Sequence, residues 1–220
     1  MVKSCDGRRR HLAIEWPGVP VSADGEDGVG CDGGADRVLV AARSRAIEHI
    51  GSHRLLDAAD YGIPQHRLRA VIVITRDGER FTWPRATNRY QPLCAWDAIG
   101  TLVSDEPLPE PVGSWADLLP SIPEGQNYLW HTSRGGGRPL FGYRTRFWSF
   151  LLKLAKDQPS WTLPVQPGPS TGPFHWDNRP LTITEMLRLQ SFDADWLVDG
   201  LYRERVRQVG NATPPRASLR

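Results

Sequence analysis

The amino-acid sequence predicts an α/β fold, and two local patterns carry that prediction. Residues 70–75, Ala-Val-Ile-Val-Ile-Thr, form a continuous apolar run rich in β-branched residues, which is typical of a strand buried on both faces in an α/β sheet. Farther along, Thr182 and Glu185 are spaced as a capping box, which predicts a helix of about two to three turns from Ile183. Between them, residues 79–178 are irregular and rich in Pro, Gly and aromatic residues, which favours a small domain of short strands and loops.

The composition is that of an ordinary globular protein. The chain has 220 residues, of which 40% are apolar and 24% charged, and this argues against a wholly disordered or fibrous chain. No apolar run approaches the roughly 18 residues of a membrane span, and no signal-peptide core is present. We therefore expect a soluble protein with no membrane partner. Cys5, Cys31 and Cys94 are too far apart to predict a disulfide framework or a metal site.

The basic residues are nearly all arginine, with 24 Arg against 3 Lys, although the formal net charge is only +2. Arg presents a planar fork of donors that suits phosphate groups and guanine edges. A GC-rich genome also favours Arg codons, so the composition alone does not identify nucleic acid as the ligand.

Residues 125–156 contain no acidic residue. This acid-free segment interleaves basic and aromatic side chains, namely Arg134, Arg138, Arg144, Arg146, Lys153 and Lys156 with Tyr128, Trp130, Phe141, Tyr143, Phe147 and Trp148. A basic, aromatic surface suits a phosphate backbone and exposed bases, and an ordinary solvated face mixes both signs of charge. Nucleic-acid binding is the favoured interpretation. The alternative for the aromatic residues is a small-domain core, and Gly135–Gly137 predict either a hinge or a close backbone approach.

Two further loops have the residue types of binding sites. In the loop before the predicted strand, Arg67 and Arg69 are two positions apart, so in extended backbone they can converge on one anion. The alternative is a pair of solvated arginines. Near the C-terminus, residues 208–215 predict a turn that can present backbone amides and the Asn211 side chain to a ligand, although such a turn is also common in ordinary loops.

Three segments, in the expected order, resemble conserved motifs of the DNA (cytosine-5) methyltransferases. Residues 58–69 with the strand after them are similar to the eighth motif, residues 179–192 to the ninth, and residues 207–215 to the tenth. The family carries its variable target-recognition domain between the eighth and ninth motifs, where the acid-free segment falls here. The resemblance implies an incomplete Rossmann-like S-adenosylmethionine-dependent methyltransferase fold with an inserted, irregular, mostly β target-recognition domain.

The same resemblance divides the chain into four parts. We expect residues 1–46 to be unassigned and disordered or non-native, residues 47–78 to end the catalytic domain, residues 79–178 to form the target-recognition domain, and residues 179–220 to return to the catalytic domain.

The resemblance also implies roles for single residues. Arg67 and Arg69 would face the flipped cytosine and its flanking phosphates, and one of them would hold the pyrimidine O2, because chemistry on a base requires its extrusion from the duplex. Asn211, with the backbone of Ala212 and Thr213, would line the S-adenosylmethionine pocket. The expected DNA contacts are Gln65, which shapes the same loop as the two arginines, and Arg134, Arg138, Arg144, Arg146 and Lys153. No metal is implied.

Three catalytic features of the family, the nucleophile, the cofactor loop and a proton-donating Glu, have no match in this sequence, whereas Arg67 and Arg69 match its catalytic arginines. Its nucleophile is a Cys that follows Pro, and its thiolate attacks C6 of cytosine so that C5 can take the methyl group. Here Cys5 follows Ser, Cys31 follows Gly and Cys94 follows Leu. The Gly-rich cofactor loop is missing, and so is the Glu-Asn-Val segment whose Glu protonates the ring. We therefore expect the C-terminal half of a restriction–modification methyltransferase that is inactive alone.

Residues 1–44 match nothing in the family, which leaves two explanations open. A frameshift or misread start joined out-of-frame sequence to a genuine C-terminal half, or a separately encoded N-terminal subunit supplies the nucleophile. One rival function is a non-catalytic, sequence-specific remnant that binds double-stranded DNA, and another is an unrelated Arg-rich α/β protein. In each methyltransferase reading we expect a cytoplasmic, nucleoid-associated bacterial protein.

Overall fold

The computed structural model describes residues 11–15, 50–75, 81–103, 106–193 and 195–215. The chain divides into two compact units. The first contains residues 1–56 and 68–84, and the second contains residues 57–67 and 85–220. The chain therefore passes between the units on either side of the loop that holds Arg67.

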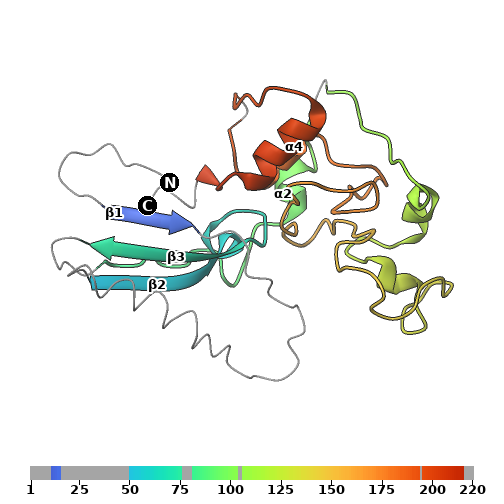
Figure 1. Cartoon of the computed structure of the whole chain (residues 1–220), viewed down its shortest axis with the longest axis horizontal. Coiled ribbons are helices and arrows are strands. Elements are labelled where there is room, and N and C mark those ends of the chain that lie inside the picture. Colours follow the sequence, from blue (N-terminus) through green and yellow to red (C-terminus); the bar gives the residue numbers. More distant parts are fainter. Residues whose placement is uncertain (1–10, 16–49, 76–80, 104–105, 194, 216–220) are drawn as a thin grey trace. The chain divides into compact units, whose positions relative to one another are not determined.

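The first unit contains a three-stranded sheet in the order β1–β3–β2 (Figure 1). The strands are β1 (His11–Glu15), β2 (Ile50–Asp57) and β3 (Leu68–Thr75). β1 runs antiparallel to β3, with His11 opposite Thr75 and Glu15 opposite Val71. The predicted strand at residues 70–75 is confirmed, and it begins two residues earlier, at Leu68.

Two expectations about this sheet need correction. Residues 11–15 form an edge strand, although they fall in the segment that was expected to hold no packed structure; the rest of residues 1–46 lies outside the described part of the chain. In β3, Val73 is 4% exposed, whereas Val71, Ile72 and Ile74 remain partly exposed. β3 is thus not buried on both faces, because the described residues of its unit include no helix that could cover the sheet.

The second unit is built from short helices and loops. Its helices are η1 (Ala58–Tyr61), α2 (Ala95–Ile99), η2 (Ala116–Ser121), η3 (Tyr128–His131), α3 (Ile183–Leu189) and α4 (Tyr202–Asn211). In the described part of residues 85–178, strand pairing is limited to isolated bridges such as Phe150–Thr171. The expectation of a mostly β region is therefore wrong, because the many prolines lack the N–H that a continuous ladder requires.

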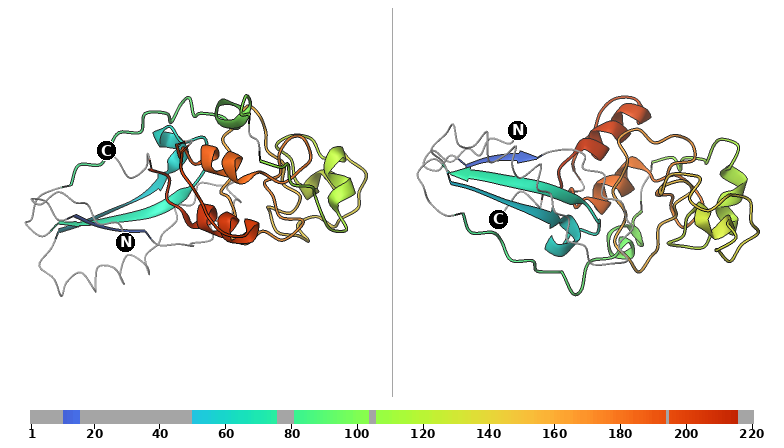
Figure 2. Two further views of the ribbon diagram at one scale, coloured as in Figure 1. Left: turned by 90° about the horizontal axis from the view of Figure 1, so that it is seen from above. Right: turned by 60° about the horizontal axis from the view of Figure 1, so that its bottom comes forward.

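Two apolar clusters hold this unit together. The larger one joins α2, α3 and α4, and α3 lies beside α4 (Figure 2). The second cluster contains Leu119, Ile122, Tyr128, Phe150, Leu151 and Phe174. Part of the aromatic content of the acid-free segment is thus core, as the alternative interpretation proposed. None of the helices in the described ranges combines the length and apolar character needed to cross a bilayer.

Helix α3 confirms the predicted capping box. The Thr182 hydroxyl accepts a hydrogen bond from the Glu185 amide at 3.1 Å, and the Glu185 carboxylate accepts one from the Thr182 amide at 2.8 Å. The helix begins at Ile183 and has seven residues. Local sequence therefore determines where this helix starts.

Helix α4 corrects the expectation of a turn at residues 208–215, because residues 208–211 form the last turn of the helix. Its buried apolar side chains are only Val206 and Val209. Such a narrow apolar stripe is too weak to predict a helix from periodicity. Contacts with α3 and with the stretch around Pro164 stabilise it instead.

Gly210 is required by a close backbone approach at the end of α4. A Cβ atom there would lie 2.8 Å from both the Pro164 carbonyl oxygen and the Val165 Cα. We expect Gly210→Ala to lower the free energy of unfolding by about 2 kcal/mol, because overpacking against rigid backbone costs up to about 3 kcal/mol and Ala recovers about 1 kcal/mol of helix propensity. Urea denaturation measures the change. The control is Gly168→Ala, whose Cβ would meet only Thr171 Oγ1 at 3.5 Å, and an equal loss in both variants would contradict the steric argument.

Candidate nucleic-acid interface

The loop at residues 57–67 is closed at its base by hydrogen bonds. The Asp57 carboxylate accepts the Arg67 amide at 2.8 Å and the Ala59 amide at 3.2 Å. The Ala58 amide also donates to the Arg67 carbonyl at 3.2 Å. In the middle of the loop, Gly62 adopts a φ of 76°, a left-handed conformation that suits glycine. The loop therefore has a defined shape before any ligand binds.

His66 forms an ion pair with Asp57 in this loop. The His66 Nδ1 lies 2.9 Å from Asp57 Oδ2, and the imidazole is 40% exposed. The hydrogen bond to Asp57 raises the pKa of His66 against the opposing effect of burial. Burial alone would raise the pKa of Asp57, but the hydrogen bonds from His66 and from the Arg67 and Ala59 amides outweigh it, so this pKa is lowered. The pair places a titratable cation at the partly exposed edge of the loop.

This pair makes the stability of the protein depend on pH. The raised pKa of His66 means that protonated His66 contributes to the free energy of unfolding. This contribution is fully present below the ordinary pKa of 6.5 and is lost as the pH rises through the raised pKa. The lowered pKa of Asp57 means that its carboxylate also contributes to the free energy of unfolding. That contribution is present above the ordinary pKa of 3.8 and is lost as the pH falls through the lowered pKa. We expect His66→Gln to destabilise the chain more at about pH 5.5 than at about pH 8.5 in urea denaturation. His53→Gln, at an exposed position of β2, is the control, and an equal loss at both pH values would rule out the ion pair as the cause.

Arg67 points away from solvent and toward the end of α4. It is 3% exposed, and its Nη2 donates to the carbonyl oxygens of Gly210 at 3.1 Å and Ala212 at 2.9 Å. Arg69 lies in β3, is partly exposed, and donates from Nη1 to the Leu68 carbonyl at 2.8 Å. These contacts correct the expectation that both guanidinium groups are directed at an anion, because one of them binds backbone carbonyls.

Two buried glutamines flank Arg67. Gln190, at the end of α3, is fully buried and donates from Nε2 to the Val209 carbonyl at 2.8 Å. Gln65 is fully buried as well, and its backbone forms an isolated bridge with Ser160. Among the described residues, the Gln65 side-chain amide has no hydrogen-bond partner. Gln65 therefore lies inside the loop and not on its surface, which corrects the expectation of a direct DNA contact in this conformation.

The segment Asn211–Thr213 leaves the end of α4. Asn211 is exposed, and Ala212 and Thr213 are partly exposed. The Ala212 amide donates to the Val209 carbonyl at 3.1 Å, and its backbone is extended. The segment can therefore offer a side-chain amide and backbone groups to a ligand.

A run of three rings joins the loop to the acid-free segment. The His66 and Trp161 ring centroids are 5.7 Å apart, and those of Trp161 and Trp148 are also 5.7 Å apart. Trp148 is exposed, and the other two rings are partly exposed. Neither Trp161 nor His66 was singled out from the sequence, because the aromatic run forms only when the chain brings residues 66, 148 and 161 together.

Four arginines of the acid-free segment are exposed, namely Arg134, Arg138, Arg144 and Arg146. The guanidinium carbons of Arg134 and Arg144 lie 4.0 and 5.3 Å from the Tyr143 ring centroid. Arg146 lies 5.5 Å from the Phe150 ring centroid. We call these four residues the arginine face. Contact with aromatic rings orients the guanidinium groups of Arg134, Arg144 and Arg146 at the surface.

The triglycine segment, residues 135–137, packs closely around Trp130. A Cβ atom on Gly137 would lie 2.7 Å from the Trp130 ring, and Gly135 and Gly136 approach the same residue even more closely. The Gly137 amide donates to the Trp130 carbonyl at 2.9 Å. Of the two sequence interpretations, the close backbone approach is confirmed.

The two lysines of the segment do not belong to the arginine face. Lys153 is 3% exposed and donates from Nζ to Asn178 Oδ1 at 2.6 Å, and burial lowers its pKa. Lys153 was expected to contact DNA, but its side chain lies in the packed interior. Lys156 forms an ion pair with Glu124 at 2.8 Å.

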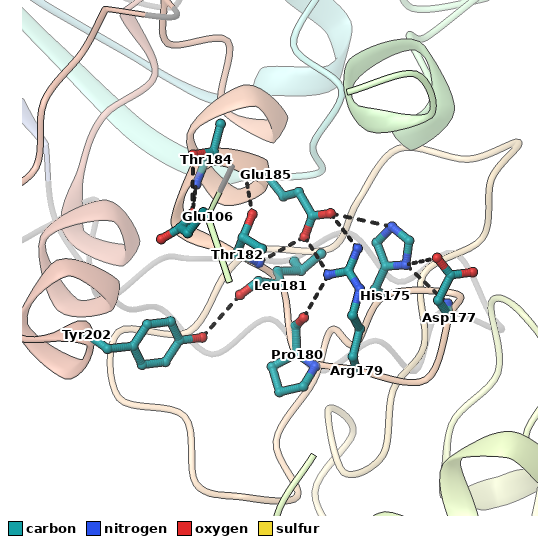
Figure 3. A network of polar contacts seen from close by, with 10 residues as sticks. All are labelled: Glu106, His175, Asp177, Arg179, Pro180, Leu181, Thr182, Thr184, Glu185 and Tyr202. Carbon is teal, nitrogen blue, oxygen red and sulfur yellow. Dashed lines mark hydrogen bonds and ion pairs between the residues drawn. The ribbon is translucent and has the colours of Figure 1, made fainter. Parts of the chain in front are cut away.

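A buried polar network anchors the start of α3 (Figure 3). Arg179 donates two hydrogen bonds to the Glu185 carboxylate, from Nη2 at 2.7 Å and from Nη1 at 2.9 Å. Burial alone would raise the pKa of Glu185, but the hydrogen bonds from Arg179 and the Thr182 amide lower it. His175 Nε2 lies 3.6 Å from the same carboxylate. The Glu185 carboxylate thus caps the start of α3 and pairs with the Arg179 guanidinium group.

A second set of contacts in Figure 3 ties the start of α3 to α4. The Glu106 carboxylate accepts hydrogen bonds from the Thr184 amide and hydroxyl, each at 3.2 Å. It also accepts one at 3.3 Å from Arg205 of α4, which the figure does not draw. The Tyr202 hydroxyl donates to the Leu181 carbonyl at 3.1 Å. These contacts place the ends of both helices in one framework.

Comparison with known proteins identifies the class of the fold and then the family. The chain is similar to a solved structure described as a DNA modification methyltransferase encoded within a prophage of E. coli, with a TM-score of 0.56, 15% identity, and coverage of 87% of this chain and 64% of that one. The fold is thus that of a methyltransferase. The model of the C-5 cytosine-specific DNA methylase family matches residues 46–218, and the chain belongs to that family.

The curated relatives that the chain resembles are Type II methyltransferases. M.SacI of Streptomyces achromogenes is 40% identical over 185 residues, which cover 73% of this chain and 47% of the relative. M.Eco47II of Escherichia coli is 32% identical over 191 residues, which cover 76% of this chain and 43% of the relative. The chain therefore spans less than half the length of these two relatives.

Proposed function

We propose that this chain is the C-terminal half of a DNA (cytosine-5) methyltransferase of a restriction–modification system. The whole enzyme transfers a methyl group from S-adenosylmethionine to C5 of cytosine in a specific duplex site. The match of residues 46–218 to the C-5 cytosine-specific DNA methylase family carries this proposal. Within it, residues 47–78 end the catalytic domain, residues 79–178 recognise DNA, and residues 179–220 return to the catalytic domain.

The arginine face is the DNA-binding surface in this proposal. Its four guanidinium groups are exposed, and the acid-free segment supplies no carboxylate to compete with phosphate. The exposed Trp148 and the rings behind it extend the surface toward the loop at residues 57–67. Cationic groups bind the backbone, and aromatic faces can stack on bases.

Arg69 is the base-facing arginine in this proposal. The hydrogen bonds from Arg67 to the Gly210 and Ala212 carbonyls direct that side chain at the end of α4, which supports Arg69 for this role. Arg69 follows it by two positions and is partly exposed. Its guanidinium group would hold the pyrimidine O2 and stabilise negative charge as the ring is attacked.

The segment Asn211–Thr213 fits the part of a cofactor pocket that the resemblance implies. The Asn211 side chain is exposed and Ala212 and Thr213 are partly exposed, so an amide and two backbone groups can reach a ligand. S-adenosylmethionine supplies an electrophilic methyl group when bound. This segment would orient the cofactor, and the remainder of its site would come from the other half of the enzyme.

In this proposal the nucleophile also comes from outside this chain. Cys94 lies at the start of α2, and its Sγ donates to Asp97 Oδ2 at 3.0 Å. Burial and the neighbouring Asp97 raise the pKa of the Cys94 thiol, which lowers the thiolate fraction that a nucleophile requires. Cys5 and Cys31 lie outside the described residues, and neither follows a proline. We therefore expect the chain alone to be inactive.

A chimera tests this proposal directly. Residues 46–218 would replace the corresponding part of M.SacI, to which they are similar, and transfer of tritiated methyl groups from S-adenosylmethionine to duplex DNA would be measured. We expect transfer by the chimera, and none by the 220-residue chain alone or by a chimera with its Pro-Cys cysteine changed to Ser. A folded chimera that binds duplex DNA without methylating it would support the rival function of a non-catalytic DNA-binding remnant. Methyl transfer by the chain alone would refute the assignment of the nucleophile.

A further inference from the structure

We propose that Arg67 and Gln190 form a clamp that positions the cofactor segment Asn211–Thr213. This inference rests on the proposed function and adds to it a residue pair that couples the loop at residues 57–67, which directly precedes the strand of Arg69, to the cofactor segment. Arg67 belongs to the loop and Gln190 to the end of α3, and both donate to the carbonyls at the end of α4. Both are positioning residues, because their donors reach backbone and not substrate.

The end of a helix needs such donors. The last four carbonyls of an α-helix have no partner within the helix, and they carry the negative end of its dipole. In α4 the clamp donates to two of these carbonyls. Gln190 Nε2 binds the Val209 carbonyl at 2.8 Å, beside the bond from the Ala212 amide, and Arg67 Nη2 binds the Gly210 carbonyl at 3.1 Å. The same Nη2 binds the Ala212 carbonyl at 2.9 Å, one residue beyond the helix. A charged donor shared between the helix end and the exit segment fixes the direction in which the chain leaves α4.

The clamp works in a buried, closely packed setting. Arg67 is 3% exposed and Gln190 is fully buried, and their bonds to the Gly210 and Val209 carbonyls are buried, so water competes little for these two carbonyls. On its other side, Gly210 lies against the backbone of Pro164 and Val165, where no Cβ would fit. The end of α4 is therefore held from two directions, and Asn211 remains exposed beside it.

The clamp also links the position of the loop at residues 57–67 to the end of α4. The Arg67 amide is bound by the Asp57 carboxylate at 2.8 Å, and its side chain reaches α4. A rearrangement of this loop on entry of a base would thus change the position of residues 211–213. The expected coupling is that bound cofactor favours the loop conformation shown here, and that the loop in this conformation favours cofactor binding.

Hydrogen exchange on the 220-residue chain tests the clamp itself. We expect Arg67→Met and Gln190→Met each to accelerate exchange of the amides in residues 206–213 about tenfold or more, with little change in α3, because charged and buried hydrogen bonds are lost. The control is Arg203→Met, at an exposed position of α4, which should leave exchange unchanged. Unchanged exchange in both clamp variants would overturn the clamp. If Arg67→Met unfolds the chain, the exchange rates of residues 206–213 in Gln190→Met alone test the clamp.

Cofactor affinity tests the positioning role. In the M.SacI chimera without DNA, we expect Arg67→Met to weaken S-adenosylmethionine binding about tenfold or more, Arg67→Lys to restore part of it, and Arg203→Met to leave it unchanged. Arg69→Met should instead lower kcat with little effect on cofactor Kd. Unchanged cofactor Kd in Arg67→Met, in a chimera that methylates DNA, would overturn this inference and leave the proposed function intact. An inactive parent chimera would refute the proposed function, and the inference with it.

Discussion

Glu185→Ala is expected to lower the free energy of unfolding by about 3–5 kcal/mol, because it removes one partner of a buried ion pair. The Glu185 carboxylate is 8% exposed and accepts two hydrogen bonds from Arg179, whose side chain is 13% exposed. Without it, a guanidinium charge remains in the interior with no carboxylate opposite. The variant also loses the capping bond to the Thr182 amide, so the start of α3 is weakened as well.

A double-mutant cycle separates the ion pair from the cap. We expect Arg179→Met combined with Glu185→Met to be less destabilising than the sum of the single changes, because the double variant leaves no uncompensated charge. Glu124→Gln is the matched control at the exposed pair with Lys156, where a loss below about 1 kcal/mol is expected. Strictly additive effects of Arg179 and Glu185 in urea denaturation would contradict the interaction.

Replacement of Arg144 and Arg146 by Ala is expected to weaken binding of the 220-residue chain to duplex DNA by about 10- to 100-fold at low salt. Each phosphate contact contributes about 0.9 to the slope of log affinity against log salt concentration, so the slope should fall by about 2. Fluorescence anisotropy with a labelled duplex across a salt series measures both quantities. Both side chains are exposed, and they contact the rings of Tyr143 and Phe150 that orient them.

The matched control removes the same charge from another place. Arg85→Ala with Arg89→Ala takes two exposed arginines from the second unit outside the acid-free segment. We expect this pair to change affinity only weakly through the net charge. Equal losses in the two double variants would show that binding follows total charge and not the arginine face, as expected of an unspecific basic protein.

Local sequence was sufficient for the elements whose signals are short in range. The apolar run at residues 70–75 predicted β3, and Thr182 with Glu185 predicted the start of α3, because the preference of β-branched residues for strands and a capping box both depend on neighbouring residues. The resemblance in three ordered segments indicated the family, which the match over residues 46–218 confirms. The roles assigned to single residues stay predictions for the experiments above.

Other features depend on residues that are distant along the chain. Helix α4 was missed because its stability comes from contacts with α3 and the Pro164 stretch more than from its own periodicity. Lys153 was expected at the surface from its charge, but it packs inside with Asn178 as a partner. Composition reports which groups are present, and only packing decides which of them reach solvent.

The difference is clearest for Arg67. Its sequence context indicated a functional arginine in a loop before a strand, and nothing in the flanking residues could show that its guanidinium group meets carbonyls 143 and 145 positions away. Chain signals for strands, caps and turns are local because they depend on backbone geometry over a few residues. The partner of a long side chain, by contrast, depends on how helices and loops pack. For this reason the fold class and the family could be predicted from the sequence, whereas the clamp on α4 could be identified only in the tertiary structure.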